Sequence, residues 1–233
     1  VPIGFEFPDP PQMFQKTHSM IFDFGLPTSA TGLWVMTDLG TMNFSFYIVN
    51  GWDTIVDDNN QKTYGGRVGF MPSESFKMGV SYITGNETGN GAWEEAENLS
   101  VFDVDVTVFS ESGSIIGFEY TRGVHEKNGL IKPGEDDARW NGLLFMTYLK
   151  LSDVSGITFR YDVFRDDDGA RLPSGVKEKR QAYTISPSLV FGDGPSLRLE
   201  YRDVTSTESV FKGKKNMLEK REKVFGVEVF YNF

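Results

Sequence analysis

The sequence predicts an all-β fold, a transmembrane antiparallel up-and-down β-barrel of the outer-membrane type. Two patterns lead to this prediction. Apolar and polar residues alternate with period two through most of the chain, which is typical of strands with one apolar face. Short and long links also alternate between these segments, as in barrels whose two ends lie on opposite sides of a membrane. We expect one domain over residues 1–233, with about twelve strands.

Composition excludes several other classes of protein. The 233 residues contain no Cys and carry a formal net charge of −10. The lack of Cys excludes disulfide frameworks, thiol nucleophiles and Cys-ligated metals, and the acidic balance argues against nucleic-acid binding. The longest nearly unbroken apolar stretch, 143–149, is far shorter than the ~18–20 residues of a transmembrane helix. A barrel strand needs no such stretch, because its apolar residues occupy alternate positions.

Seven segments alternate clearly enough to assign an apolar face. Four further strands are predicted near residues 31–39, 62–71, 140–151 and 180–191. In 31–39 and 140–151 the odd-numbered and the even-numbered positions are both apolar, so neither face can be assigned there. In chain order, the apolar positions of the seven segments are Met42, Phe44, Phe46, Ile48, Phe76, Met78, Val80, Tyr82, Phe102, Val104, Val106, Val108, Phe118, Tyr120, Ile157, Phe159, Tyr161, Val163, Leu197, Leu199, Tyr201, Phe225, Val227, Val229, Tyr231 and Phe233.

The links between strands form two classes. Short, turn-like links rich in Gly, Ser, Asp and Pro fall at 39–41, 72–75, 110–113, 152–156 and 192–195. Long polar links fall between them at 6–30, 53–61, 85–97, 127–139, 166–179 and 206–221. A strand of about ten residues, tilted by about 45°, spans roughly the ~25 Å apolar band of an outer-membrane barrel. The alternative is a soluble β-sandwich or lipocalin-like barrel, whose Greek-key connections would mix link lengths at both ends.

The polar residues that alternate with these apolar positions are predicted to line the interior of the barrel. They include acids and bases together, as in pores where charged side chains set ion preference. Arg67 belongs to this set if Tyr64, Gly66, Val68 and Phe70 face lipid. The alternative is an interior filled by ion pairs, which would leave a barrel with negligible conductance. The candidate pore-lining residues are Arg67, Asp103, Asp105, Glu119, Arg160, Asp162, Arg198, Glu200, Arg202 and Glu228.

The link over 6–30 differs from the other long links. It contains four prolines and an apolar run over 20–26, so it is too hydrophobic to extend into solvent. It is also longer than most loops of compact domains. We expect it to fold into the interior as a constriction or to pack on a neighbouring subunit.

The C-terminal pattern resembles the assembly signal of bacterial outer-membrane proteins, which their barrel-assembly machinery reads. Its residues are Phe225, Val227, Val229, Tyr231 and the terminal Phe233. Residues 2–32, 49–72 and 161–171, the last reading YDVFRDDDGAR, are similar to the OmpL-like β-barrel porin family of Gram-negative bacteria. This resemblance implies a pore-type barrel with further strands upstream. Because barrels of one chain have even strand numbers, we expect residues 1–8 to be a short twelfth strand or the end of a portion absent from this sequence.

Two functions follow from these observations. The first is a porin in the bacterial outer membrane, a water-filled channel for passive diffusion of small hydrophilic solutes or ions. The alternative is a structural or scaffolding barrel that holds a partner protein or is occluded. The expected partners are the lipid bilayer, the solutes and the barrel-assembly machinery, with a homotrimer or a partner protein as further candidates. We expect no enzyme activity, cofactor or metal site, since the chain has two His and no nucleophile-elbow or phosphate-binding motif.

Overall fold

The structure is a computed structural model that describes residues 3–9, 12–53, 55, 61–87, 97–127, 136–191, 194–213 and 217–231. Its main element is a sheet of eleven antiparallel strands. A π-helical turn, η2 (Ile21–Gly25), precedes the sheet. The strands of the sheet are β1 (Gly32–Asp38), β2 (Met42–Val49), β3 (Thr63–Ser73), β4 (Phe76–Asn86), β5 (Asn98–Phe109), β6 (Ile115–His125), β7 (Ala138–Ser152), β8 (Ser155–Asp166), β9 (Glu178–Val190), β10 (Ser196–Ser206) and β13 (Arg221–Phe230).

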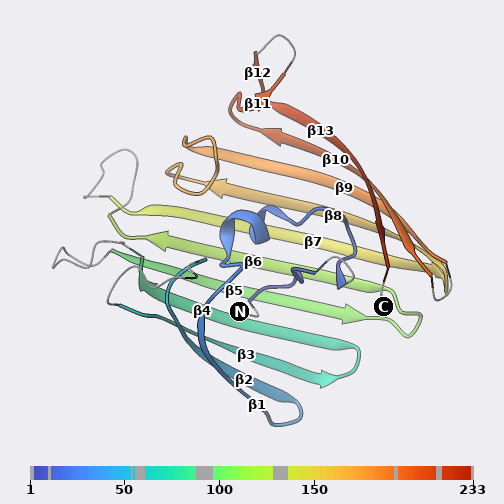
Figure 1. Ribbon diagram of the computed structural model, residues 1–233, viewed down its shortest axis with the longest axis horizontal. Coiled ribbons are helices and arrows are strands. Elements are labelled where there is room, and N and C mark those ends of the chain that lie inside the picture. The colour runs from blue at the N-terminus through green and yellow to red at the C-terminus, as the bar shows by residue number, and fades with distance from the viewer. Residues whose placement is uncertain are drawn as a thin grey trace.

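Each strand of this sheet pairs with the sheet strand that follows it in the chain, which confirms the up-and-down order (Figure 1). The small hairpin of β11 (Phe211–Lys212) and β12 (Leu218–Glu219) lies in the link between β10 and β13. Among the described residues, β1 and β13 form the two edges of the sheet and are not paired with each other. No helix in the described part of the chain is long and apolar enough to cross a membrane.

The links alternate in length as the sequence predicts. The strand ends that the short links join lie together at one end of the sheet, on the right of Figure 1, and the strand ends that the long links join lie at the other end. Two of the short links use glycine in the left-handed region, with φ of +84° at Gly40 and +85° at Gly113. A side chain with a Cβ rarely adopts this conformation, so glycine allows the chain to reverse tightly at these positions.

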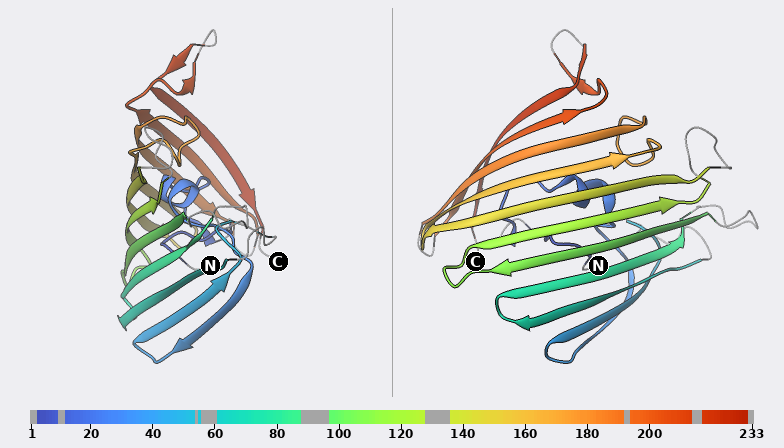
Figure 2. Two further views of the ribbon diagram at one scale, coloured as in Figure 1. Left: turned by 90° about the vertical axis from the view of Figure 1, so that its left-hand side faces the viewer. Right: turned by 180° about the vertical axis from the view of Figure 1, so that it is seen from behind.

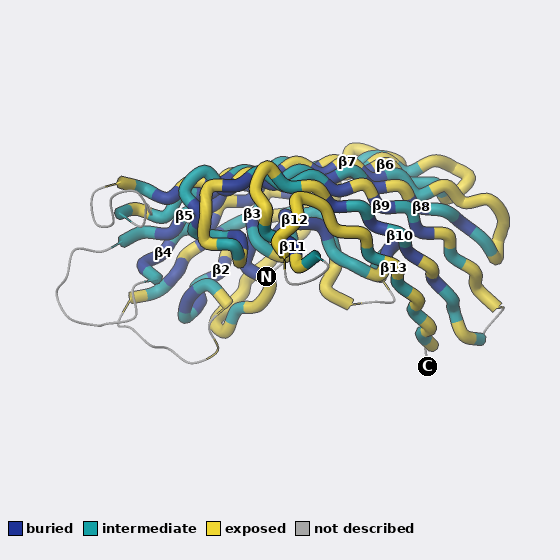
Figure 3. The backbone as a smooth tube through the Cα atoms, turned by 90° about the horizontal axis from the view of Figure 1, so that it is seen from above, coloured by how far each residue is buried: buried dark blue, intermediate teal, exposed yellow. Residues whose placement is uncertain are grey.

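The sheet is strongly curved, with a concave face and a convex face (Figure 2). Buried and exposed residues alternate along the strands (Figure 3). On the convex face of β13, Phe225, Val227 and Val229 are 78%, 65% and 65% exposed. The charged residues that alternate with the apolar positions lie on the concave face, where they are largely buried. This arrangement agrees with the predicted faces and places apolar side chains on the outside.

The N-terminal segment, residues 3–9 and 12–30, lies along the concave face (Figure 2). This agrees with the expectation that the long link folds inward. Residues 3–9 form no strand, so the short twelfth strand expected near the N-terminus is not found among them. The reason is visible at Phe5, whose main-chain N–H donates to the side chain of Glu119 over 3.0 Å. The segment therefore bonds to side chains of the sheet, and the described sheet has eleven strands.

The segment also explains why β7 is apolar at both odd-numbered and even-numbered positions, a pattern from which no face could be assigned. Trp140, Leu144 and Met146 point to the concave face, where they are 1%, 0% and 2% exposed. They belong to one apolar cluster with Ile21 of η2 and with Phe164. These strand residues are apolar on the inner face because an apolar segment, and not water, covers them.

The apolar residues of β1 are exposed on both faces of the strand. All seven residues of β1 are exposed. Pairing assigns the faces, because Val35 lies opposite Phe46 and Trp34 opposite Tyr47. Val35 therefore points outward and Trp34 inward.

Candidate functional site

All ten predicted interior residues lie on the concave face. They come from β3, β5, β6, β8, β10 and β13. Arg67 and Glu228 are partly buried, and the other eight are buried. The N-terminal segment covers much of this face, which the alternation of polar and apolar residues does not indicate. For nine of the ten the burial is tolerated because the charges form ion pairs and hydrogen bonds, whereas neither carboxylate oxygen of Asp103 has a hydrogen-bond partner in the described structure.

Arg67 and Asp105 form an ion pair on the wall made by β3, β4 and β5. Arg67 donates to Oδ1 of Asp105 over 2.9 Å and also contacts Oδ2. Two parallel contacts fix the guanidinium relative to the carboxylate. Gly79 makes room for this pair, since a Cβ at this position would lie 1.8 Å from a guanidinium nitrogen of Arg67. Tyr64, Val68 and Phe70 are exposed on the opposite face of the sheet, and whether they face lipid stays a prediction.

Arg160 and Asp162 of β8 and Arg202 of β10 form a second cluster. Arg160 and Arg202 both lie opposite Thr184 of β9 in the strand register. Asp162 accepts from both arginines, over 3.0 Å from Arg160 and 3.1 Å from Arg202. The arginines bind the segment as well, because each donates to the main-chain oxygen of His18, over 2.9 and 2.8 Å.

The carboxylates of the sheet bind main-chain amides of the segment. Glu200 accepts from the amides of Lys16 and Thr17 over 2.9 and 3.1 Å, and from the Thr17 hydroxyl over 2.7 Å. Asp162 accepts from the amide of Met20 over 3.2 Å. Each buried amide thus gains an acceptor although it belongs to no strand ladder.

Arg198 connects the segment to the last strand. It lies directly opposite Glu228 of β13 and pairs with its carboxylate. The same guanidinium donates to the main-chain oxygens of Met13 and Gln15. Arginines therefore bind carbonyl groups of the segment, while carboxylates bind its N–H groups.

A cation between two indole rings fixes the segment at the end of the sheet where the long links lie. The guanidinium of Arg171 is 4.8 Å from the Trp52 ring centre and 5.1 Å from that of Trp140. Its Nε donates to the main-chain oxygen of Phe24 over 2.7 Å. Burial lowers the pKa of Arg171, while the charges of Asp53 and Asp166 oppose that shift. Sequence reasoning missed this contact, since its three side chains come from separate links and strands.

Sequence reasoning also missed the uncharged polar residues of the inner face and one lysine. Thr158, for example, donates to the main-chain oxygen of Phe14 over 2.9 Å. Along each strand these residues alternate with the outward apolar residues, as the charged residues do. This alternation was the signal that could have found them. The further inner-face residues are Lys77, Ser81, Thr121, Thr158, Thr184 and Ser186.

The residues of the predicted assembly signal lie on β13 and just after it. Phe225, Val227, Val229 and Tyr231 are all exposed. The terminal Phe233 lies outside the described residues. Recognition by an assembly machinery stays a prediction.

A protein-family comparison identifies the class of this barrel. The sequence profile described as "Putative beta-barrel porin-2, OmpL-like" matches residues 2–233. The chain belongs to this porin family. The match confirms the resemblance seen at residues 2–32, 49–72 and 161–171, and an OmpL-like porin is a β-barrel. Comparison with curated proteins gives no match.

Two solved structures share the fold of this OmpL-like porin. The anion-selective porin from Comamonas acidovorans has a TM-score of 0.63 at 10% identity, covering 91% of this chain and 64% of its own. The outer-membrane expressed OmpT of Vibrio cholerae has a TM-score of 0.55 at 13% identity, covering 83% and 62%. The chain thus spans less than two thirds of either protein. At these identities the similarity concerns the fold alone.

Proposed function

We propose that this porin forms a water-filled channel in the bacterial outer membrane through which small hydrophilic solutes diffuse. The observation that carries the proposal is the separation of the two faces of one sheet. Apolar side chains cover the convex face, whereas the acids and arginines of the predicted interior set lie on the concave face. In a membrane barrel these are the lipid-facing and interior faces. The proposal uses no catalytic group and no cofactor.

The N-terminal segment would narrow this channel. It is bound through Arg160, Asp162, Glu200 and Arg202, so part of the charged face contacts protein and not water. The same observation favours the second candidate function, a barrel that the segment occludes. Proposed partners are the bilayer, the solutes and the barrel-assembly machinery. Association into a homotrimer or with a partner protein stays a prediction.

Planar-bilayer recordings with the purified full-length protein test the two functions. Defined conductance steps in KCl support the porin. Deletion of residues 12–24 should then raise the size of each step, because it removes the bound part of the segment. If the complete protein is silent and the folded deletion variant conducts, the occluded barrel is the better description. Silence of both would contradict the channel.

A further inference from the structure

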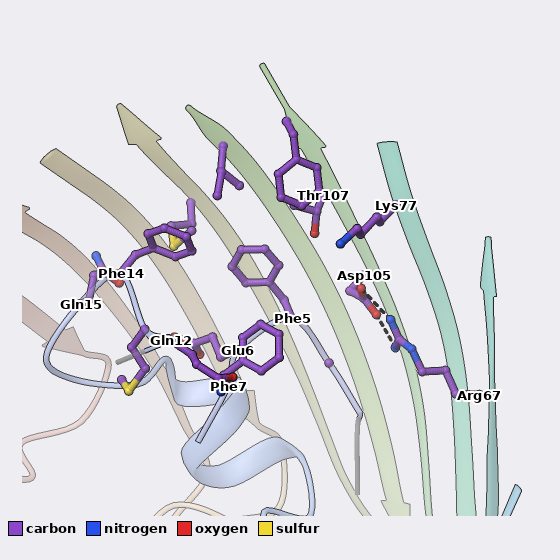
Figure 4. A pocket seen from close by; sticks show the side chains of 15 residues that line it. Phe5, Glu6, Phe7, Gln12, Phe14, Gln15, Arg67, Lys77, Asp105 and Thr107 are labelled. Carbon is purple, nitrogen blue, oxygen red and sulfur yellow. Dashed lines mark hydrogen bonds and ion pairs between the residues drawn. The ribbon is translucent and has the colours of Figure 1, made fainter. Parts of the chain in front are cut away.

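A pocket lies between the N-terminal segment and the wall of the sheet, near the end with the short links. Its volume is about 320 Å³, within the usual range for sites that hold a small organic molecule. The segment contributes Phe5 and Phe14, while the strands contribute Lys77, Phe109 and Met146. Figure 4 shows Phe5 and Phe14 on one side of the pocket, with Lys77 and Thr107 on the other.

The lining of the pocket is mostly apolar. Side chains of Phe5, Phe14, Phe109, Ile115 and Met146 surround the space. Phe5 is held in place twice, since its amide donates to Glu119 over 3.0 Å and its ring lies over Gly117. A Cβ at Gly117 would lie 2.3 Å from that ring. An apolar ligand body would therefore enter a preformed space between aromatic rings.

The charges around the pocket are balanced except at one residue. Asp105 pairs with Arg67, and Glu6 pairs with Arg160 over 3.2 Å. Lys77 has no anionic partner among the described residues, and its ammonium lies 4.9 Å from the centre of the Phe109 ring. The unpaired positive charge beside an aromatic surface favours an anionic ligand.

Gln15 is a further polar residue in the lining of the pocket. Gln15 lines the pocket and is 2% exposed, yet neither Nε2 nor Oε1 of its side chain has a hydrogen-bond partner in the described structure. Buried polar groups of this kind are nearly always satisfied. Both atoms are buried and do not face the empty space, so the proposed site does not use this amide.

We propose that this pocket binds small aromatic monocarboxylates, with the ring among the phenylalanines and the carboxylate on Lys77. The proposal rests on the proposed channel function in one respect, because it makes such anions a class of solute for that channel. Binding itself requires only the pocket. The two ideas can therefore fail separately.

The test is an equilibrium binding measurement on the purified full-length protein with benzoate as the probe. Benzyl alcohol, which lacks the charge, and acetate, which lacks the ring, are the comparison ligands. We expect saturable benzoate binding, weaker binding of both comparison ligands, and a loss of about tenfold or more for benzoate in Lys77→Gln. Lys77 is exposed, so this variant should fold. Lys212→Gln, which removes the same charge on the β11–β12 hairpin, should bind benzoate like the parent.

Three results would overturn the proposal: no saturable benzoate binding, equal binding of benzoate and acetate, or a Lys77→Gln variant that binds benzoate unchanged. Conductance in KCl without benzoate is recorded on the same preparations. A protein that conducts but does not bind benzoate keeps the channel and loses the pocket assignment. A protein that binds through Lys77 but does not conduct keeps the pocket and loses the channel.

Discussion

Thr17 donates both its main-chain amide and its hydroxyl to the carboxylate of Glu200, over 3.1 and 2.7 Å. The two residues are 183 positions apart in the chain. Glu200 is 4% exposed and also accepts from the amide of Lys16. One carboxylate on β10 thus satisfies three donors of the N-terminal segment, and it fixes the segment on the concave face.

Replacing Glu200 by Ala should release this part of the segment. The change leaves three donors without their acceptor, and one buried donor alone costs about 1–3 kcal/mol. We expect trypsin to cleave after Lys16 at least about tenfold faster than in the parent, because cleavage follows the population of the detached segment. The measurement is the rate of limited proteolysis under native conditions.

Glu200→Gln is the matched control for this variant. Its amide oxygen can still accept from the two main-chain amides, and its NH₂ group can donate to the Thr17 hydroxyl. Cleavage after Lys16 should therefore stay closer to the parent rate than in Glu200→Ala. If Ala and Gln accelerate cleavage equally, or if neither does, Glu200 does not hold the segment in the way described.

Replacing Gly142 by Val should displace the π-helical turn. A Cβ at Gly142 would lie 2.4 Å from Cγ1 of Ile21, whose side chain is fully buried. Moving Ile21 exposes apolar surface and costs on the order of 1.5–3 kcal/mol of segment attachment. Single-channel conductance of the folded variant should rise, because the segment then occupies less of the interior. Leu143→Val, which changes the outward side chain of the same strand, should leave the conductance unchanged.

The sequence predicts the strands and their faces well, because the polarity of a strand residue depends on the face of the sheet on which it lies. Arg198 and Glu200 are polar and Leu199 is apolar because the two faces differ, and no distant contact is needed to see this. The path of the N-terminal segment is different. It depends on long-range hydrogen bonds such as Thr17 to Glu200, which leave no periodic pattern in the chain. The burial of the charged face and the pocket at Lys77 follow from that path, so sequence reasoning could not place them.

Val227 tests whether the convex face lies in lipid. It is 65% exposed at the middle of β13, with Phe225 and Val229 on the same face. In a bilayer an arginine at the midplane of this face costs about 2–4 kcal/mol, whereas a change on a water-exposed surface usually stays within about 0.5 kcal/mol. We therefore expect Val227→Arg to lower the free energy of unfolding from phospholipid vesicles by the larger amount, with Val227→Ile as the near-neutral control. The measurement is a reversible urea titration followed by tryptophan fluorescence. A change no larger than that of the isoleucine variant would mean that this face is in contact with water or protein and not with lipid.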